Sequence, residues 1–429
     1  MKFNLSSNTV TKVASNTVYQ IVGKLISMSI TMLAVVIITR AYGREGYGAF
    51  SLMQSWPALF FVIVDFGINA IAAKDITEDW SKAGKYLGNI LIIRFLFSMF
   101  LILVISLSLN FFPYSSDLKD GIRLGLFLLI TQSLFSTTNI FFQAKLRYDY
   151  STIAYVGGYI LILILVLISS YLKLNITWVN FSYVVGGFLT FILSMHFVNK
   201  MGVKPDFSFD RKIWKYLILS ALPIGIMFLF SQMSFKEDAL MLSFLKLPVS
   251  YSLNNTESVA VYALPYKVFE VMLVVPTFFM NSVYPVLVNH MIEGEQKLRK
   301  TFTRVIYFLI GSGLVIGLLG IVFSSLSMKI LGGDEFSQSS GVLNILSGGL
   351  FIFYLTSPIS WLIVTLGYQK YLPWIYFVSF SFNLVMNFIF IPKYSFYGAS
   401  WITVLSELIV LILLIIFARK SWRLKYARD

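Results

Sequence analysis

The sequence contains no cysteine and very little histidine. None of its 429 residues is Cys, and only two are His, at positions 196 and 290. The lack of Cys excludes disulfides, iron–sulfur clusters and cysteine–zinc sites. With only two His, at distant positions in the sequence, a His-rich metal site is also disfavoured. We expect both His residues near the ends of spanning helices, outside any catalytic setting.

Charged residues are scarce as well. Asp, Glu, Lys and Arg make up 13% of the chain, against about 25% in a soluble domain. Hydrophobic residues make up 57%, so the composition is that of a membrane protein. The motifs GxxxxGK[ST], HExxH and GxSxG are all missing, which argues against P-loop nucleotide hydrolysis and against the common hydrolases. The sequence therefore predicts a transporter rather than an enzyme.

Runs of about 20 apolar residues, the length of a membrane-spanning helix, recur along the whole chain. We predict an all-α polytopic membrane protein with about twelve transmembrane helices. The expected spans are 18–39, 47–73, 85–112, 121–144, 152–172, 177–198, 214–245, 258–289, 303–331, 340–367, 371–391 and 396–418.

The basic residues predict the orientation. Placing both termini in the cytoplasm puts 22 Lys and Arg on the cytoplasmic side and 8 on the outer side. The net charge of +14 is thus explained by the orientation of the chain in the membrane and by contact with anionic lipid. It does not indicate binding of nucleic acid. The basic connection at 199–213 divides the chain into two predicted six-helix lobes around a central cavity, 1–198 and 214–429, the second ending in a basic cytoplasmic tail.

Ionisable side chains lie inside the predicted spans. Inserting each of them into a membrane costs a few kcal/mol of free energy, so such residues mark a binding site or a transport pathway. The nine are Lys24, Asp65, Arg94, Lys236, Glu237, Asp238, Lys267, Glu270 and Glu407.

The four basic groups suit an anionic ligand. We predict that Lys24, Lys236, Lys267 and Arg94 bind pyrophosphate or acidic sugar in a cavity. Two alternatives stay open: Lys24 and Arg94 snorkel to the inner interface, and Lys267 neutralises Glu270, three residues further along the same helix face.

The acidic groups suit a coupling cation, H+ or Na+. We predict this role, or a place in the cavity wall, for Asp65, Asp238, Glu237 and Glu270. Asp65 is the clearest candidate, because no basic residue lies within helical reach of it in the sequence. Residues 236–238 are consecutive and point about 100° apart, so they do not all face one cavity. No cofactor is expected.

Amide and aromatic side chains are frequent in the spans. They suit hydrogen bonding and stacking with sugars, and equally hydrogen bonds that hold membrane helices together. They include Gln54, Trp56, Asn69, Gln132, Asn139, Gln143, Gln232, Asn281, Asn383 and Asn387.

Several stretches, in order along nearly the whole chain, resemble polysaccharide flippases of the Wzx type. These belong to the multidrug/oligosaccharidyl-lipid/polysaccharide (MOP) exporter superfamily. The stretches are TRAYGREGYGAFS at 39–51, DFG at 65–67, ALPI at 221–224, YALPYK at 262–267, VYPVL at 283–287, IPKY at 391–394 and GASWIT at 398–403.

The resemblance implies a function. Such a protein moves an undecaprenyl-pyrophosphate-linked oligosaccharide repeat unit, for example an O-antigen unit of lipopolysaccharide, from the inner to the outer leaflet of the bacterial inner membrane. It also implies two lobes that alternate access around a cationic cavity, and the polysaccharide polymerase and chain-length machinery as partners.

Two other functions are compatible with parts of the sequence. A cation-coupled exporter of small amphiphilic drugs has the same fold. A membrane-embedded polysaccharide polymerase or ligase would carry a large outer loop, whereas the connections here are short.

Overall fold

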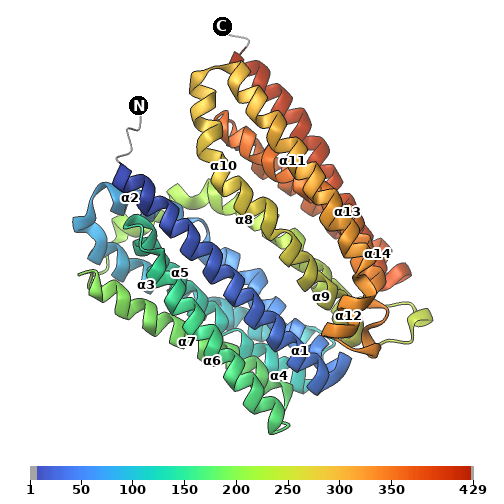
Figure 1. Cartoon of the computed structure of the whole chain (residues 1–429). Coiled ribbons are helices and arrows are strands. Elements are labelled where there is room, and N and C mark those ends of the chain that lie inside the picture. The colour runs from blue at the N-terminus through green and yellow to red at the C-terminus, as the bar shows by residue number, and fades with distance from the viewer. Residues whose placement is uncertain (1–6, 427–429) are drawn as a thin grey trace. The chain divides into compact units, whose positions relative to one another are not determined.

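The computed structural model describes residues 7–426, and their side chains except those of 7–17, 223, 224, 227, 234 and 235. Over this range the chain is helical and forms no strand (Figure 1). The helices are α1 (Ser7–Asp65), α2 (Ile68–Glu78), α3 (Ala83–Ser108), α4 (Ser116–Gly125), α5 (Leu128–Ala144), α6 (Tyr148–Tyr171), α7 (Ile176–Lys200), α8 (Arg211–Phe244), α9 (Asn255–Met272), α10 (Val274–Glu293), α11 (Glu295–Val322), α12 (Ser324–Leu331), α13 (Ser339–Thr365) and α14 (Leu372–Tyr426).

The described helices confirm an all-α polytopic membrane protein with about twelve spans. Within residues 7–426, nine segments are long and apolar enough to cross a membrane. Two of the long helices are kinked and so provide two helical pieces each: α1 bends at Gly43 (φ 64°) and α14 bends at Ser395 (φ 50°). Helix α8 has 34 residues, and at about 1.5 Å per residue it also exceeds a hydrocarbon core of about 30 Å.

Some predicted spans are interrupted. The span predicted at 47–73 breaks at Phe66 and Gly67, which have φ values of 39° and 74°. Glycine adopts this left-handed region without a steric penalty, so the DFG stretch ends α1 and starts α2 there. Similarly, 258–289 divides into α9 and α10 at Leu273, and 303–331 into α11 and α12 at Phe323.

The contacts group the chain into two units. The first holds residues 1–42 and 49–229, and the second holds 43–48 and 230–429. The division thus falls inside α8, whereas the sequence placed it in the 199–213 connection. Residues 1–6 and 427–429 lie outside the described part, so the cytoplasmic position of the termini stays a prediction.

Hydrogen bonds explain why the connection stays with the first unit. The backbone N–H of Asp206 donates to the carbonyl of Gly84 at 2.9 Å. The buried amide of Asn89, on α3, donates to the Ser208 carbonyl and accepts from the Asp210 N–H. A Cβ on Gly88 would lie 1.8 Å from the Asp206 carbonyl oxygen, so this close approach of the connection to α3 requires glycine.

Packing of the first unit brings α5, α6 and α7 together. An apolar cluster joins α2, α3 and α5 with the ends of α7 and α8. Helices α6 and α7 meet at Gly158 and Gly186, where a Cβ on either glycine would lie within 3 Å of the other's carbonyl oxygen. Small residues of this kind let membrane helices approach closely.

Residues 43–48 belong to the stretch at 39–51 that resembles flippases, and they contact the start of α9. The Arg44 guanidinium forms an ion pair of 3.1 Å with Glu257, which belongs to the capping box that starts α9. A Cβ on Gly48 would lie 2.0 Å from the Thr256 carbonyl oxygen. This segment of α1 therefore docks on the start of α9 through one charge and one glycine.

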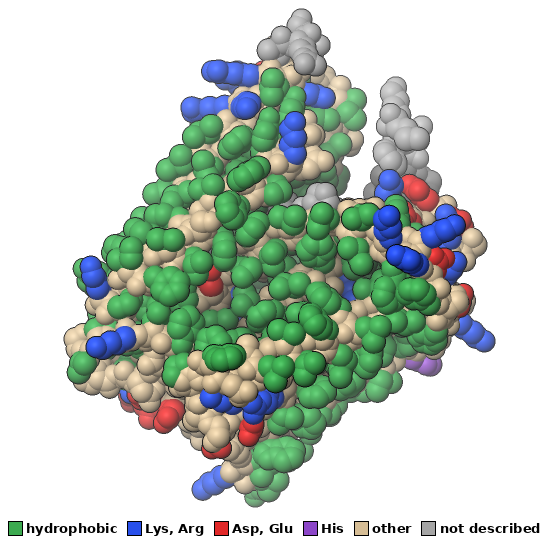
Figure 2. Space-filling model, turned by 180° about the vertical axis from the view of Figure 1, so that it is seen from behind, with side chains coloured by type: hydrophobic (Ala, Val, Ile, Leu, Met, Phe, Trp, Pro, Cys, Tyr) green, Lys and Arg blue, Asp and Glu red, His purple; other side chains and the backbone are tan. Residues whose placement is uncertain are grey.

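The outer surface suits a lipid environment. Figure 2 shows hydrophobic side chains over most of the visible face, with Lys and Arg mostly around its margins. Large exposed hydrophobic residues include Leu103 on α3, Ile192 on α7 and Leu318 on α11. A soluble protein would not expose so many, so the chain is a multi-pass membrane protein.

Candidate functional site

In the first unit, the structure pairs Arg94 with Asp65. Arg94 is fully buried, and its Nη2 lies 2.7 Å from Asp65 Oδ1 and 2.9 Å from Asn69 Oδ1. Its Nη1 donates to Thr137 Oγ1 at 2.9 Å. Asp65 Oδ1 also accepts from Ser136 Oγ at 2.8 Å.

This pairing corrects two sequence-based interpretations. Arg94 neither lines a cavity nor snorkels to an interface, because it is buried between α1, α2, α3 and α5. Asp65 does have a basic partner, and it comes from a different helix. The two residues hold the first unit together rather than offering free charges to a ligand.

Lys24 differs from the other predicted cations. Its side chain is exposed on α1, and no ion pair of the described residues includes it. The neighbouring Gly23 packs against Thr152 of α6, which fixes this part of the helix. Lys24 is thus an exposed positive charge on α1 in the first unit.

In the second unit, Lys236 and Lys267 share one carboxylate. Lys236 Nζ lies 2.7 Å from Glu270 Oε1, and Lys267 Nζ lies 3.0 Å from Glu270 Oε2. Lys236 also lies 5.9 Å from the centre of the Tyr266 ring. All three charged side chains are partly exposed. We call Lys236, Lys267 and Glu270 the lysine cluster.

The lysine cluster keeps one net positive charge. The ion pair between Lys267 and Glu270 that their spacing suggested is present, and Lys236 shares the same carboxylate. Glu270 itself was predicted to line the cavity or couple to a cation, and here it is an ion-pair partner of two lysines. Each ammonium carries three N–H donors, and both lysines give one of them to Glu270.

Asp238 points into a different, buried environment. Its Oδ2 accepts from Tyr262 Oη and Thr403 Oγ1, each at 2.6 Å, and its Oδ1 accepts from Asn387 Nδ2 at 2.6 Å. Lys236 and Asp238 thus face different partners, as their spacing on one helix predicted.

Two more acidic residues lie nearby in the second unit. Glu237 is buried, and the Asn383 amide, with its nitrogen turned toward the carboxylates, lies 2.7 Å from Glu237 Oε1 and 3.0 Å from Asp238 Oδ1. Glu407 accepts a hydrogen bond from Thr356. We call Glu237, Asp238, Asn383, Asn387 and Thr403 the acidic cluster.

The acidic cluster borders a very small cavity. The cavity has about 20 Å³, and Asn383, Thr403 and Glu407 are among the residues that line it. That volume holds about one water-sized particle. Asn387 Oδ1 is buried with no hydrogen-bond partner. In the described residues no group of three His, Asp or Glu side chains suits a metal ion.

In the sequence, Asn383 and Asn387 are two of many polar residues in the spans, and nothing distinguishes Tyr262 or Thr403 as site residues. Both lie in stretches that carried the resemblance, YALPYK and GASWIT. The sequence does not show that Tyr262 and Thr403 contact Asp238, because Asp238 lies on another helix.

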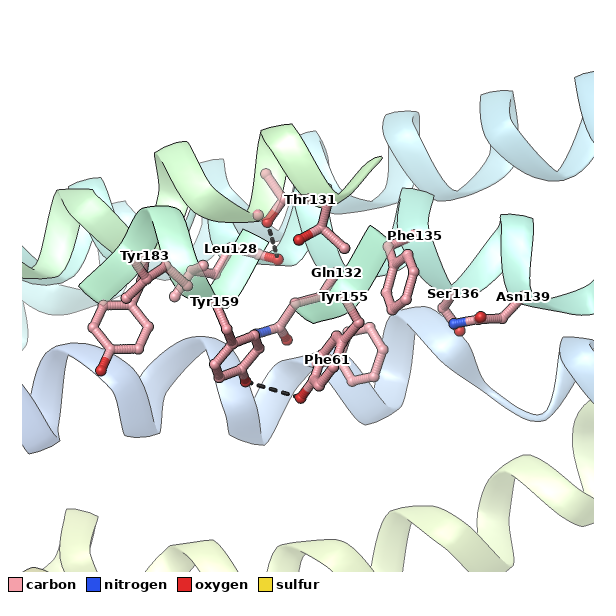
Figure 3. A pocket seen from close by; sticks show the side chains of 13 residues that line it. Phe61, Leu128, Thr131, Gln132, Phe135, Ser136, Asn139, Tyr155, Tyr159 and Tyr183 are labelled. Carbon is pink, nitrogen blue, oxygen red and sulfur yellow. Dashed lines mark hydrogen bonds between the residues drawn. The ribbon is translucent and has the colours of Figure 1, made fainter. Parts of the chain in front are cut away.

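The first unit also contains a larger pocket of about 290 Å³ (Figure 3). It lies between α1, α5, α6 and α7, and no charged side chain lines it. Aromatic and uncharged polar side chains dominate. The lining residues are Phe61, Leu128, Thr131, Gln132, Phe135, Ser136, Asn139, Tyr155, Tyr159, Ile162, Tyr183, Gly187 and Thr190.

Comparison with protein families is decisive for the class of protein. Residues 13–291, well over half of the chain, match the family described as polysaccharide biosynthesis protein. The chain belongs to this family. Residues 223–389 also match the family described as MatE. No curated protein matches the chain.

Solved structures show which fold this family member has. The chain is similar to an inward-facing multidrug resistance MATE family transporter of the MOP superfamily, with a TM-score of 0.77 and 14% identity over 92% of this chain and 94% of that one. It is similar to the lipid II flippase MurJ, with a TM-score of 0.75 and 16% identity over 94% and 89%. The MATE transporter VcmN of Vibrio cholerae gives a TM-score of 0.63 and 16% identity over 97% of both chains.

The resemblance drawn from the sequence is thus confirmed for family and fold. The chain is a multi-pass membrane protein of the polysaccharide biosynthesis family, with the two-lobe fold of MOP-superfamily transporters.

Proposed function

We propose that this protein is a flippase for undecaprenyl-pyrophosphate-linked oligosaccharide repeat units, such as O-antigen units. It moves them from the inner to the outer leaflet of the bacterial inner membrane by alternating access. A glycan with a pyrophosphate does not cross hydrocarbon unaided, because its polar groups would lose water without replacement. The protein therefore needs a polar, cationic path, and it needs no catalytic group.

The observation that carries this proposal is the lysine cluster. Lys236 and Lys267 lie within two of the predicted spans and share the carboxylate of Glu270, so the three side chains carry one net positive charge that attracts an anion. A pyrophosphate offers several oxygens to both ammonium groups at once. The exposed Lys24 supplies a further charge in the first unit. The family match and the fold shared with a lipid II flippase support a lipid-linked glycan as the ligand.

We assign ion coupling to the acidic cluster, with H+ or Na+ as the coupling ion. Glu237 and Asp238 are buried without a basic partner among the described residues. Buried carboxylates without a countercharge are costly, and binding a proton or a sodium ion relieves that cost. The unpartnered oxygen of Asn387 provides one more ligand. Glu270 and Asp65 are left out of this role because each is engaged in an ion pair.

The test is made in the native host. Deleting the gene should abolish surface polysaccharide, with lipid-linked repeat units accumulating in the inner leaflet. A chain carrying Lys236→Gln and Lys267→Gln should restore little polysaccharide at normal protein level. Lys246→Gln is the matched control, because Lys246 is exposed just beyond the end of α8. Normal surface polysaccharide in the double variant would overturn the assignment of the lysine cluster.

Coupling is tested separately. Asp238→Asn keeps the shape of the side chain and one acceptor oxygen, but it removes the charge and replaces the other oxygen by an NH2 group. We expect loss of transport in vesicles whether the gradient is of protons or of sodium. The wild-type protein then identifies the ion, since only one of the two gradients should drive it.

The alternative is a cation-coupled exporter of amphiphilic drugs, which the match to the MatE family favours. Under that function, deletion leaves surface polysaccharide normal and increases sensitivity to cationic dyes. If the flippase function holds, the polymerase and chain-length proteins are the expected partners, and cross-linking in the membrane tests this.

A further inference from the structure

We infer that the uncharged pocket of the first unit is a binding subsite for one neutral sugar ring. This inference rests on the proposed function and names the part of the ligand that the pocket recognises. The pocket has about 290 Å³, at the lower end of ligand sites, which begin at about 300 Å³. It therefore suits a single ring rather than a whole repeat unit.

The aromatic residues provide the flat surface that a sugar ring needs. Tyr155 and Tyr159 lie on successive turns of α6, with ring centres 4.5 Å apart, and the Tyr155 hydroxyl donates to that of Tyr159 at 2.9 Å (Figure 3). Phe135 of α5 stacks on Tyr155 with ring centres 5.8 Å apart. One face of a pyranose carries C–H groups, which pack on aromatic rings, while its hydroxyls point outward to polar groups.

The polar residues provide hydrogen bonds without charge. Gln132 lies one turn before Phe135 and Ser136 on α5, and its side-chain amide makes no hydrogen bond with any described residue. Such an amide has both donors and an acceptor free, which matches the hydroxyl or acetamido groups of a sugar. Thr131 and Asn139 flank it on the same helix and line the same pocket.

The lining also argues against other ligands. A pyrophosphate would need a basic side chain, and a cationic drug would favour an acidic one, yet the pocket has neither. Asp65, which is paired with Arg94, is not among the lining residues but accepts a hydrogen bond from Ser136, which is. The pyrophosphate is thereby assigned to the lysine cluster, and the sugar ring is assigned to this pocket.

Binding is measured on the full chain in nanodiscs by saturation-transfer NMR. The probes are N-acetylglucosamine, methyl galactoside, methyl rhamnoside and the repeat-unit oligosaccharide released from the host polysaccharide without pyrophosphate or lipid. We expect at least one probe to bind through its ring C–H protons. Gln132→Leu, which preserves size, should raise the Kd about tenfold, as expected for a lost hydrogen bond of about 1.4 kcal/mol.

Matched controls exist on the same helices. Gln143→Leu on α5 and Tyr171→Leu on α6 alter exposed side chains outside the pocket and should leave the Kd unchanged. A thermal melt confirms that each variant is folded. The inference is overturned if no sugar binds, if Gln132→Leu has no effect, or if ethidium binds in this pocket and the sugars do not.

The outcome is separable from that of the proposed function. The probes lack pyrophosphate, so Lys236→Gln should leave sugar binding intact. Sugar binding without polysaccharide transport would overturn the flippase alone. Transport without sugar binding would overturn the subsite alone.

Discussion

The carboxylate of Asp65, at the last residue of α1, lies 2.7 Å from the guanidinium of Arg94, which is fully buried on α3. The pair has a structural consequence. A buried ion pair adds little stability compared with apolar residues, but removing one partner leaves an uncompensated charge and costs about 3–5 kcal/mol.

Replacing Asp65 therefore tests whether it is a structural or a coupling residue. Asp65→Ala should lower the melting temperature and the amount of folded protein, because Arg94 would lose its countercharge. The double variant Asp65→Leu with Arg94→Met should recover much of that loss, since no charge stays buried. Thermal melts of the purified protein measure both effects.

The control for this prediction is an exposed pair in the same unit. Asp120 lies 2.7 Å from Arg123, and both side chains are well exposed. Asp120→Ala should cost at most about 1 kcal/mol. An Asp65→Ala protein that is as stable as wild type and only fails to transport would instead restore Asp65 to a coupling role.

This pair also shows which features of the structure could not be predicted from the sequence. Apolar runs predicted the helices, because the hydrocarbon thickness fixes the length of a span. The angle between consecutive helical residues predicted that Lys236 and Asp238 face different partners. The Asp65–Arg94 pair joins residues 29 positions apart, and a sequence alone shows only neighbours within about one helical turn.

The same limit applies to the candidate sites. Asp238 is linked to Thr403 across 165 positions, and no local pattern reports such a contact. The pocket of the first unit is lined by tyrosines from α6 and α7. Their spacing in the sequence is ordinary for a membrane helix, so it does not predict a pocket. Individual residue types were visible in the sequence, whereas their assembly depended on how the helices pack.

Gly48 should tolerate no side chain. Its missing Cβ would lie 2.0 Å from a backbone carbonyl oxygen of Thr256, and a backbone atom cannot move aside as a side chain can. Gly48→Ala should destabilise the protein by about 1–3 kcal/mol, the usual cost of overpacking. Gly311→Ala is the matched control, because Gly311 is exposed on α11 and nothing lies within 4 Å of its added Cβ. Equal melting temperatures for the two variants would contradict this packing.

The connection between α7 and α8 should loosen in acid. A side-chain hydrogen bond from Lys85, 2.6 Å away, lowers the pKa of Asp210 below its usual value of about 3.9. A lowered folded-state pKa means that the stabilisation is present above the ordinary value and is lost as pH falls through the folded value. We therefore expect release of the connection only below about pH 4.

A spin label measures that release. The chain has no cysteine, so Phe207→Cys, at an exposed position of the connection, gives a single labelling site. The label should become mobile below about pH 4 in the wild-type background. Asp210→Asn should make it mobile at neutral pH as well. A label whose mobility is the same at pH 3 and pH 7 would show that the Lys85–Asp210 contact does not hold the connection.

Glu270 should compete with the ligand for Lys236 and Lys267. It occupies both lysines in the structure, so an incoming pyrophosphate must displace it. Glu270→Gln raises the net charge of the lysine cluster from one to two, and the affinity for inorganic pyrophosphate should rise about tenfold, as 1.4 kcal/mol of added attraction would give. Titration calorimetry at two salt concentrations measures this, with a steeper salt dependence expected in the variant. Because tighter binding also slows release, the same variant should export less polysaccharide than wild type. An unchanged affinity would mean that the two lysines are not where the pyrophosphate binds.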